Sequence, residues 1–102
     1  MKVAIVDTCY PEFLAGVEPR LAGLGSAAGH EVVMQECFGT FDAWSRNLRA
    51  IGVDAFDVIG NSELLARAWC AENGVDYPGT VATAEAIIAR QDPDVVLVQD
   101  DV

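Results

Sequence analysis

The chain has 102 residues, 52% of them hydrophobic, which is enough for the core of one domain and too few for most two-domain enzymes. Six basic against sixteen acidic side chains give a formal charge of −10, and so negative a surface repels nucleic-acid backbones and anionic lipid headgroups. We therefore expect a folded, acidic domain with neither nucleic acid nor a membrane as its partner.

Three segments have the composition of strands buried in a parallel sheet. Residues 2–7 form a short apolar run closed by an acid, and β-branched side chains dominate a second run at residues 94–99. A weaker candidate spans residues 55–60, between Gly52 and Asn61. We expect the first and last of these segments to be core strands.

The segment from residue 40 to residue 51 is the clearest helix. Thr40 is suited to cap it, and Gly52 to end it. Its apolar residues recur at helical spacing, so we expect them to face the core. They are Phe41, Trp44, Leu48 and Ile51.

Two further helices are expected before the last strand. One begins at Asn61 or Ser62, which are both suitable caps. The other runs from residue 81 to residue 90, with Thr80 as its cap and Val81 on its apolar side.

The order of these elements predicts the fold class. Strands that alternate with helices pair in parallel, with helices on the faces of the sheet and right-handed crossovers. We expect a single α/β domain over residues 1–102, a Rossmann-like three-layer sandwich with a short, mostly parallel sheet of three or four strands.

Glycines interrupt residues 15–38, and two interpretations of this segment remain open. In the first, residues 21–28 form a weak helix and residues 30–34 form a strand. In the second, residues 34–38 extend the helix of residues 40–51 backward. The second is slightly favoured.

The residues that follow the expected strands are candidates for a binding site. In an open parallel sheet, ligands bind at the carboxyl ends of the strands, where the strand order reverses. Carboxylates, amides, a hydroxyl and a phenol follow the strands here and suit a polar ligand. These candidate ligand-binding residues are Asp7, Thr8, Tyr10, Asn61, Gln99 and Asp100. For Asp7 and Asp100, helix capping is the alternative role.

Sequence motifs for cofactors and catalysis are missing. The chain contains neither GxGxxG nor GxxxxGK[ST], so we expect no nucleotide cofactor, and no serine lies in a GxSxG context. His30 follows several glycines and is expected to be an exposed turn residue. Trp44 and Trp69 are expected to pack in the core. The sequence therefore identifies no catalytic residue.

The cysteines predict neither disulfides nor a metal site. Cys9, Cys37 and Cys70 are widely spaced, form no CxxC pair, and share the chain with a single histidine. We expect buried, reduced thiols in a cytoplasmic protein. No apolar run approaches the roughly 20 residues of a membrane span, and the first residues lack the features of a secretory signal.

Several segments resemble the start of bacterial GT-B glycosyltransferases of the group-1, spore-maturation-protein-like type. They are D-T-C-Y-P-E-F-L at residues 7–14, E-C-F-G-T-F-D-A-W-S-R-N-L-R-A-I-G at 36–52, D-V-I-G-N at 57–61 and P-D-V-V-L-V-Q-D at 93–100. The resemblance covers most of the chain outside residues 15–35. It implies a first Rossmann-like domain that binds mainly the acceptor, in enzymes whose second domain binds the nucleotide-sugar donor.

The same resemblance implies that the six candidate residues lie on the acceptor side of the cleft. With no donor-binding domain in these 102 residues, we expect an N-terminal acceptor-side part that is inactive alone. Its partners would be a sugar or another polar acceptor, together with a C-terminal domain or a second copy in a homodimer. The alternative is a free-standing Rossmann-like small-molecule-binding or protein-interaction domain without catalysis. Either version has an open sheet edge, which predicts pairing.

Overall fold

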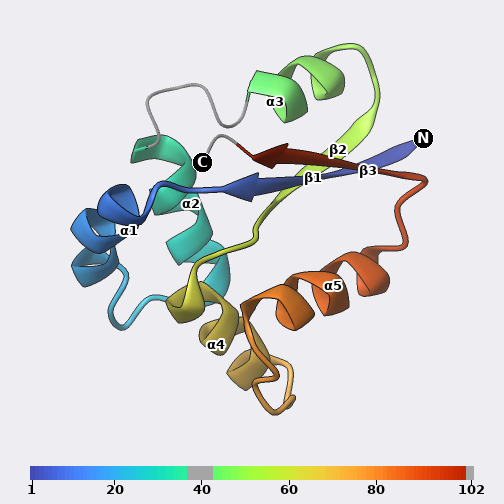
Figure 1. Ribbon diagram of the computed structural model, residues 1–102. Coiled ribbons are helices and arrows are strands. Elements are labelled where there is room, and N and C mark those ends of the chain that lie inside the picture. Colours follow the sequence, from blue (N-terminus) through green and yellow to red (C-terminus); the bar gives the residue numbers. More distant parts are fainter. Residues whose placement is uncertain (37–42, 101–102) are drawn as a thin grey trace.

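The computed structural model describes residues 1–36 and 43–100 and shows three parallel strands with five α-helices (Figure 1). The elements in chain order are β1 (Lys2–Thr8), α1 (Pro11–Val17), the 3₁₀ turn η1 (Glu18–Arg20), α2 (Ser26–Glu36), α3 (Ala43–Ala50), β2 (Asp54–Ile59), α4 (Glu63–Glu72), α5 (Thr80–Gln91) and β3 (Val95–Asp100). The predicted Rossmann-like α/β class is confirmed. None of the described helices is long and apolar enough to cross a membrane.

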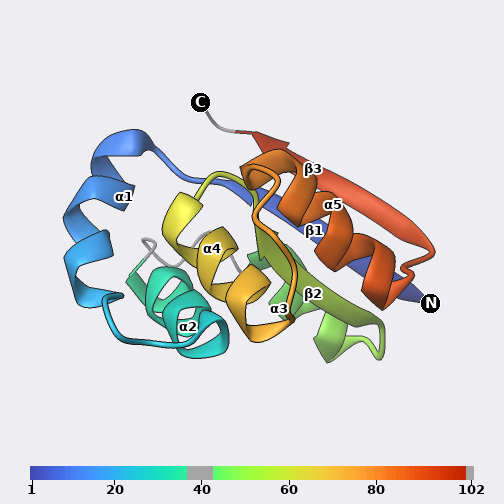
Figure 2. The ribbon, with the colours of Figure 1, turned by 90° about the horizontal axis from the view of Figure 1, so that it is seen from below.

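The sheet has the order β2-β1-β3, with all strands parallel. Ile5 in the central strand lies in register with Asp57 on one side and Leu97 on the other. The chain passes from β1 to β2 and then returns to the far side of β1, so the strand order reverses between β1 and β3. Helix α3 lies on one face of the sheet and α4 and α5 on the other, while α1 and α2 lie beyond the carboxyl ends of the strands (Figures 1 and 2).

Two clusters of buried apolar side chains hold these layers together. The smaller lies under α3 and joins Val3, Ile5 and Ala55 to the partly buried Leu48. The larger joins the carboxyl ends of the strands to α1, α2 and α4. It consists of Cys9, Leu14, Val17, Leu21, Val33, Ile59 and Leu65.

Strand β3 is a strand as predicted, but its expected place in the core is wrong. Val95, Val96 and Leu97 are 38%, 46% and 38% exposed, and Val98 is 69% exposed. Successive side chains of a strand point to opposite faces, so both faces of β3 are open to solvent. The preceding helix α5 packs on β2, at the other edge of the sheet. Position in the sheet, which the apolar composition does not encode, decides the exposure of β3.

Helix α3 confirms the predicted helix, and Leu48 of its expected buried side packs against the core, but two other residues of that side do not. Trp44 and Ile51 are 57% and 76% exposed, whereas Ser45 is fully buried. The Ser45 hydroxyl donates a hydrogen bond to the Asp57 carboxylate at 2.5 Å. This polar contact with β2 turns Ser45 inward, and the expected core position of Trp44 is therefore wrong.

Helix α2 shows that residues 30–34 are helical, so their interpretation as a strand is wrong. The predicted continuation into the next helix falls on residues 37–42. These include Thr40 and Phe41, the expected cap and first stripe residue, and they lie outside the described residues.

The two remaining helices begin differently. Ser62 caps α4 as predicted, because its hydroxyl accepts a hydrogen bond from the Leu65 N–H at 3.3 Å. At α5, the N-cap residue is Gly79, with φ at +117°, a conformation that glycine adopts without strain. Thr80 is instead the first helical residue, so its predicted capping role is wrong.

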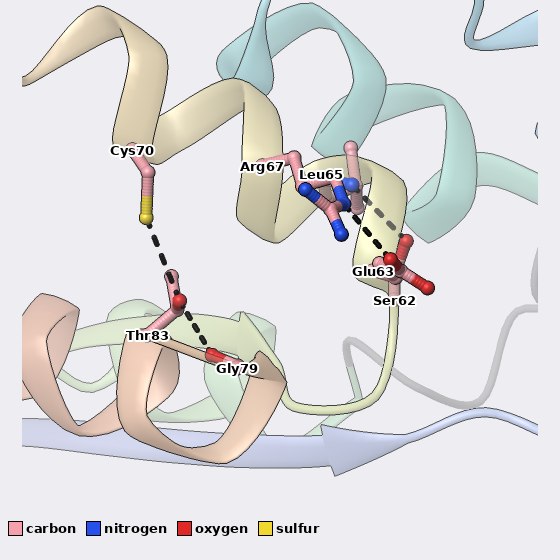
Figure 3. A network of polar contacts seen from close by, with 7 residues as sticks. All are labelled: Ser62, Glu63, Leu65, Arg67, Cys70, Gly79 and Thr83. Atoms are coloured by element: carbon pink, nitrogen blue, oxygen red, sulfur yellow. Dashed lines mark hydrogen bonds and ion pairs between the residues drawn. The ribbon is translucent and has the colours of Figure 1, made fainter. Parts of the chain in front are cut away.

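Thr83 takes the inward position on α5 (Figure 3). Its hydroxyl donates to the Gly79 carbonyl at 2.7 Å and lies 3.5 Å from the Cys70 sulfur of α4. Val81, expected on the buried side, is 67% exposed. One turn of α5 thus contacts α4 through a buried hydroxyl, next to the buried Ala84.

Helix α2 comes close to α4 at Gly29, and we expect Gly29→Leu to lower the free energy of unfolding by about 1–3 kcal/mol. Gly29 is buried, and a Cβ atom there would lie 2.6 Å from the Leu65 side chain. Leu65 belongs to the larger core cluster and cannot move without disturbing it. Urea denaturation measures the effect, with the exposed Ala28→Leu on the same helix as the control. Equal losses in the two variants would contradict this packing.

Glu72 of α4 caps the neighbouring helix α2, and we expect Glu72→Gln to reduce the pH dependence of stability. Its carboxylate accepts hydrogen bonds from the Ser26 hydroxyl at 2.7 Å and the Ser26 N–H at 2.6 Å. These bonds lower the pKa of Glu72, the hydroxyl contributing most. A lowered folded-state pKa stabilises the protein above the unfolded pKa of about 4.3, and this stability is lost as the pH falls through the folded value.

The measurement is the unfolding temperature at about pH 6 and about pH 3, in the range where such carboxylates titrate. Glu72→Gln should melt lower than the wild type at the higher pH and show a smaller drop on acidification. Glu85→Gln, at an exposed position of α5, serves as the control. A drop as large in Glu72→Gln as in the wild type would show that this carboxylate does not contribute.

Candidate functional site

The carboxyl ends of β1 and β3 meet where the strand order reverses, and two predicted site residues are joined there. The Gln99 side chain donates a hydrogen bond from Nε2 to Oδ1 of Asp7 at 3.0 Å. Asp7 is fully buried, whereas Gln99 is half-buried. Because Oδ1 of Asp7 accepts from the amide nitrogen, this bond fixes the orientation of the Gln99 amide. Asp7 itself has no surface exposed to solvent, and its role in binding stays a prediction.

Asn61 ties the end of β2 to the end of β1. Its Oδ1 accepts a hydrogen bond from the Cys9 N–H at 3.0 Å, and its Nδ2 donates to the Cys9 carbonyl at 2.7 Å. The backbone of Cys9 is thus held from both sides by one amide. The contact braces the edge of the sheet beside the Asp7–Gln99 pair, and direct contact of Asn61 with a ligand stays a prediction.

The other predicted residues line the same edge. Thr8 is half-buried and lies in register with Asp100 of β3. Tyr10 is the N-cap residue of α1 and is 49% exposed. The Asp100 side chain lies outside what the structure describes. Thr8, Tyr10, Asn61 and Gln99 are therefore the predicted residues with described surface at this edge, and their role in binding stays a prediction.

Two hollows lie elsewhere, along the outer side of β2. One, of about 230 Å³, lies between β2 and the helices α2, α4 and α5, and the other, of about 280 Å³, lies between β2, α2 and Arg49 of α3. They share three lining residues, His30, Phe56 and Asp57. No local sequence pattern indicates this region, because five separate elements build it.

His30 lies on α2 and is half-buried, so its predicted place in an exposed turn is wrong. Burial lowers the pKa of His30 because it disfavours the charged imidazolium, while the negative charges of Asp57 and Glu31 act in the opposite direction. The imidazole is consequently neutral near pH 7, with one N–H donor and one nitrogen acceptor. No local sequence pattern placed His30 in a helix, because the glycines before it suggested a turn.

Polar groups beside these hollows are covered by other parts of the chain. Arg49 donates from Nη1 to the Ala55 carbonyl at 3.0 Å and so covers one backbone acceptor of this edge strand. Oδ1 of Asp57 is enclosed and has no hydrogen-bond partner within residues 1–36 and 43–100.

Trp69 of α4 is half-buried, and the Arg90 guanidinium of α5 lies 5.0 Å from the centre of its ring, which is a cation–π contact.

Metal ligands are not clustered in the described part of the chain. Residues 1–36 and 43–100 contain no group of three or more histidine, cysteine, aspartate or glutamate side chains that could hold a metal ion. Cys9 and Cys70 are buried free thiols, as predicted, while Cys37 lies outside the described residues.

Comparison with protein families, curated proteins and solved structures found no match. The chemistry of the site is therefore inferred from its own residues alone. The carboxyl edge carries the hydroxyls of Thr8 and Tyr10 beside the oriented amide of Gln99, which are hydrogen-bonding groups of the kind that suit a polar ligand. His30, the one histidine of the chain, lies on α2 at the β2 hollows and not among these residues. Among residues 1–36 and 43–100, no histidine lies beside a nucleophile at this edge.

Proposed function

We propose that this chain is the N-terminal, acceptor-side part of a GT-B-like glycosyltransferase and does not transfer sugar by itself. The observation that carries the proposal is the Asp7–Gln99 hydrogen bond. Asp7 and Gln99 lie 92 residues apart, in two of the segments that resemble GT-B glycosyltransferases. Their hydrogen bond lies at the position where open α/β sheets bind ligands. The segment that contains Asp7 also supplies Thr8 and Tyr10 to the same edge.

The charges at this edge support an uncharged acceptor. Its candidate residues are polar or acidic, none is lysine or arginine, and the chain as a whole carries −10. The diphosphate of a nucleotide sugar needs basic side chains or backbone N–H groups at a helix N-terminus, and α1 has only seven residues. A sugar, in contrast, is recognised by hydroxyls and amides. We therefore assign the acceptor to this edge and the donor to another domain.

NMR titration of the ¹⁵N-labelled chain tests the proposal. D-glucose and N-acetylglucosamine should give saturable shifts of the Thr8, Tyr10 and Gln99 amides, whereas uridine diphosphate should give none there. Gln99→Ala removes the amide and should weaken sugar binding about tenfold. Gln35→Ala, at an exposed position of α2, is the control and should bind like the wild type. Absence of saturable shifts with either sugar, or saturable shifts with uridine diphosphate, would refute the proposal.

A second candidate function, pairing of two copies through β3, is favoured by the four exposed apolar residues of that strand. Two antiparallel β3 strands related by a two-fold axis would join the open edges into one sheet. Because each copy carries −10, association should strengthen with salt. Light scattering at low and high salt tests this, with Val98→Lys as the variant. A wild type that stays monomeric at high salt would refute the pairing.

A further inference from the structure

The hollow between β2, α2, α4 and α5 is separate from the carboxyl edge and has the size of a small ligand. Its volume is about 230 Å³, compared with roughly 150 Å³ for an apolar protein cavity that holds benzene. Large apolar side chains from three elements line it, namely Phe56 of β2, Trp69 of α4 and Ile87 of α5. Aromatic and aliphatic walls with a few polar groups are typical of small-molecule sites.

One polar group marks an end of this hollow. His30 lines it from α2 and lines the neighbouring hollow of about 280 Å³ as well, so the two spaces meet at its imidazole. The hydroxyl of Thr83 is already committed to the Gly79 carbonyl at 2.7 Å. The imidazole of His30 has one donor and one acceptor to offer a ligand in its neutral form.

The charges around the hollow select the ligand class. Asp57 lines it, but two cations lie over its aromatic walls. Lys2 Nζ lies 5.8 Å from the centre of the Phe56 ring, and the Arg90 guanidinium lies 5.0 Å from the centre of the Trp69 ring. An anionic ligand is disfavoured by the overall charge of −10 and by the cost of moving its charge out of water against apolar walls. An extended polar ligand such as a sugar would leave its hydroxyls unpaired against Phe56, Trp69 and Ile87.

We propose that this hollow binds a small uncharged aromatic compound that carries one hydroxyl or N–H group, with the ring against Trp69 and Phe56 and the polar group at His30. This second site does not depend on the proposed acceptor site at the carboxyl edge. The two sites differ in chemistry as well as in place, since the carboxyl edge presents hydroxyls and an amide.

Phenol, toluene and benzoate are matched probes for calorimetry and NMR on the complete chain. Phenol should bind saturably, with shifts of the Trp69 indole and the Ile87 methyl groups. Benzoate, of similar size but anionic, should bind at least about tenfold more weakly, because its carboxylate would lose water against apolar walls in a chain of net charge −10. Equal binding of benzoate and phenol, or no saturable binding of phenol, would overturn the proposal.

Two variants locate the site. Ala84, which is buried and lines the hollow, becomes larger in Ala84→Leu and should abolish phenol binding by filling the space. His30→Leu should weaken phenol about tenfold and leave toluene unchanged, because only phenol uses the imidazole. If Ala84→Leu fails to fold, the phenol-to-toluene ratio of His30→Leu decides, and an unchanged ratio refutes the role of His30. Gln99→Ala should leave phenol binding intact, which separates this test from that of the acceptor site.

Discussion

Replacing Ile5 with alanine is expected to lower the free energy of unfolding by about 2–5 kcal/mol. Ile5 is fully buried in the central strand and belongs to the cluster that packs the sheet against α3. Strands lie on both sides of it and prevent the sheet from collapsing into the space left by the missing atoms. Domains of this size have total stabilities of about 5–15 kcal/mol, so the loss would be a large fraction of the whole.

Urea denaturation followed by circular dichroism measures this loss. Ile51→Ala is the matched control, because Ile51 is 76% exposed and its replacement should change the free energy of unfolding by less than about 0.5 kcal/mol. Similar losses in the two variants would contradict the assignment of Ile5 to the core.

Local sequence patterns predicted where the three strands and the helices α3, α4 and α5 lie, but they did not locate α1 or α2. The apolar runs correspond to β1, β2 and β3, and the serine at residue 62 correctly marks the start of α4. Such features depend on neighbours in the chain, which the sequence displays directly. The burial of a strand cannot be predicted in this way. Strand β3 has the composition of a core strand but lies at an uncovered edge of the sheet.

The side of a helix that faces the sheet also depends on residues far away in the chain. In α3, the apolar spacing indicated Trp44 as a buried residue, whereas the carboxylate of Asp57 on β2 draws Ser45 inward. In α5, Gly79 rather than Thr80 occupies the N-cap position, which places Thr83 toward α4. Each of these differences comes from a polar contact across elements that periodicity does not report.

The candidate site was predicted where general topology rules apply and missed where packing builds it. The rule that ligands bind at carboxyl ends of strands selected Asp7 and Gln99, which the structure joins. His30 was misplaced because glycines before it suggested a turn, although residues 26–36 form a helix. The hollow beside β2 needs α2, α4 and α5 in contact with one strand edge, and no short segment encodes that arrangement.

Replacing Asn61 with alanine is expected to lower the free energy of unfolding by about 2–4 kcal/mol, because two hydrogen bonds to the backbone of Cys9 are lost together. Asn47→Ala is the control, since Asn47 is an exposed residue of α3 and alanine favours helices. Chemical denaturation gives both values. If Asn61→Ala were as stable as Asn47→Ala, the end of β1 would not need this brace.

Asn61→Asp separates the two bonds and links the brace to the candidate acceptor site. Aspartate keeps an oxygen that accepts from the Cys9 N–H, but an ionised carboxylate presents a second oxygen to the Cys9 carbonyl where the amide presented a donor. Protonation restores a donor, so the loss of stability relative to the wild type should shrink as the pH falls toward about 4. Because Cys9 directly follows the strand that ends in Thr8, sugar-induced shifts at Thr8 should weaken in Asn61→Asp at neutral pH and recover on acidification. Shifts that stay the same at both pH values would show that the brace stabilises the sheet without positioning the binding edge.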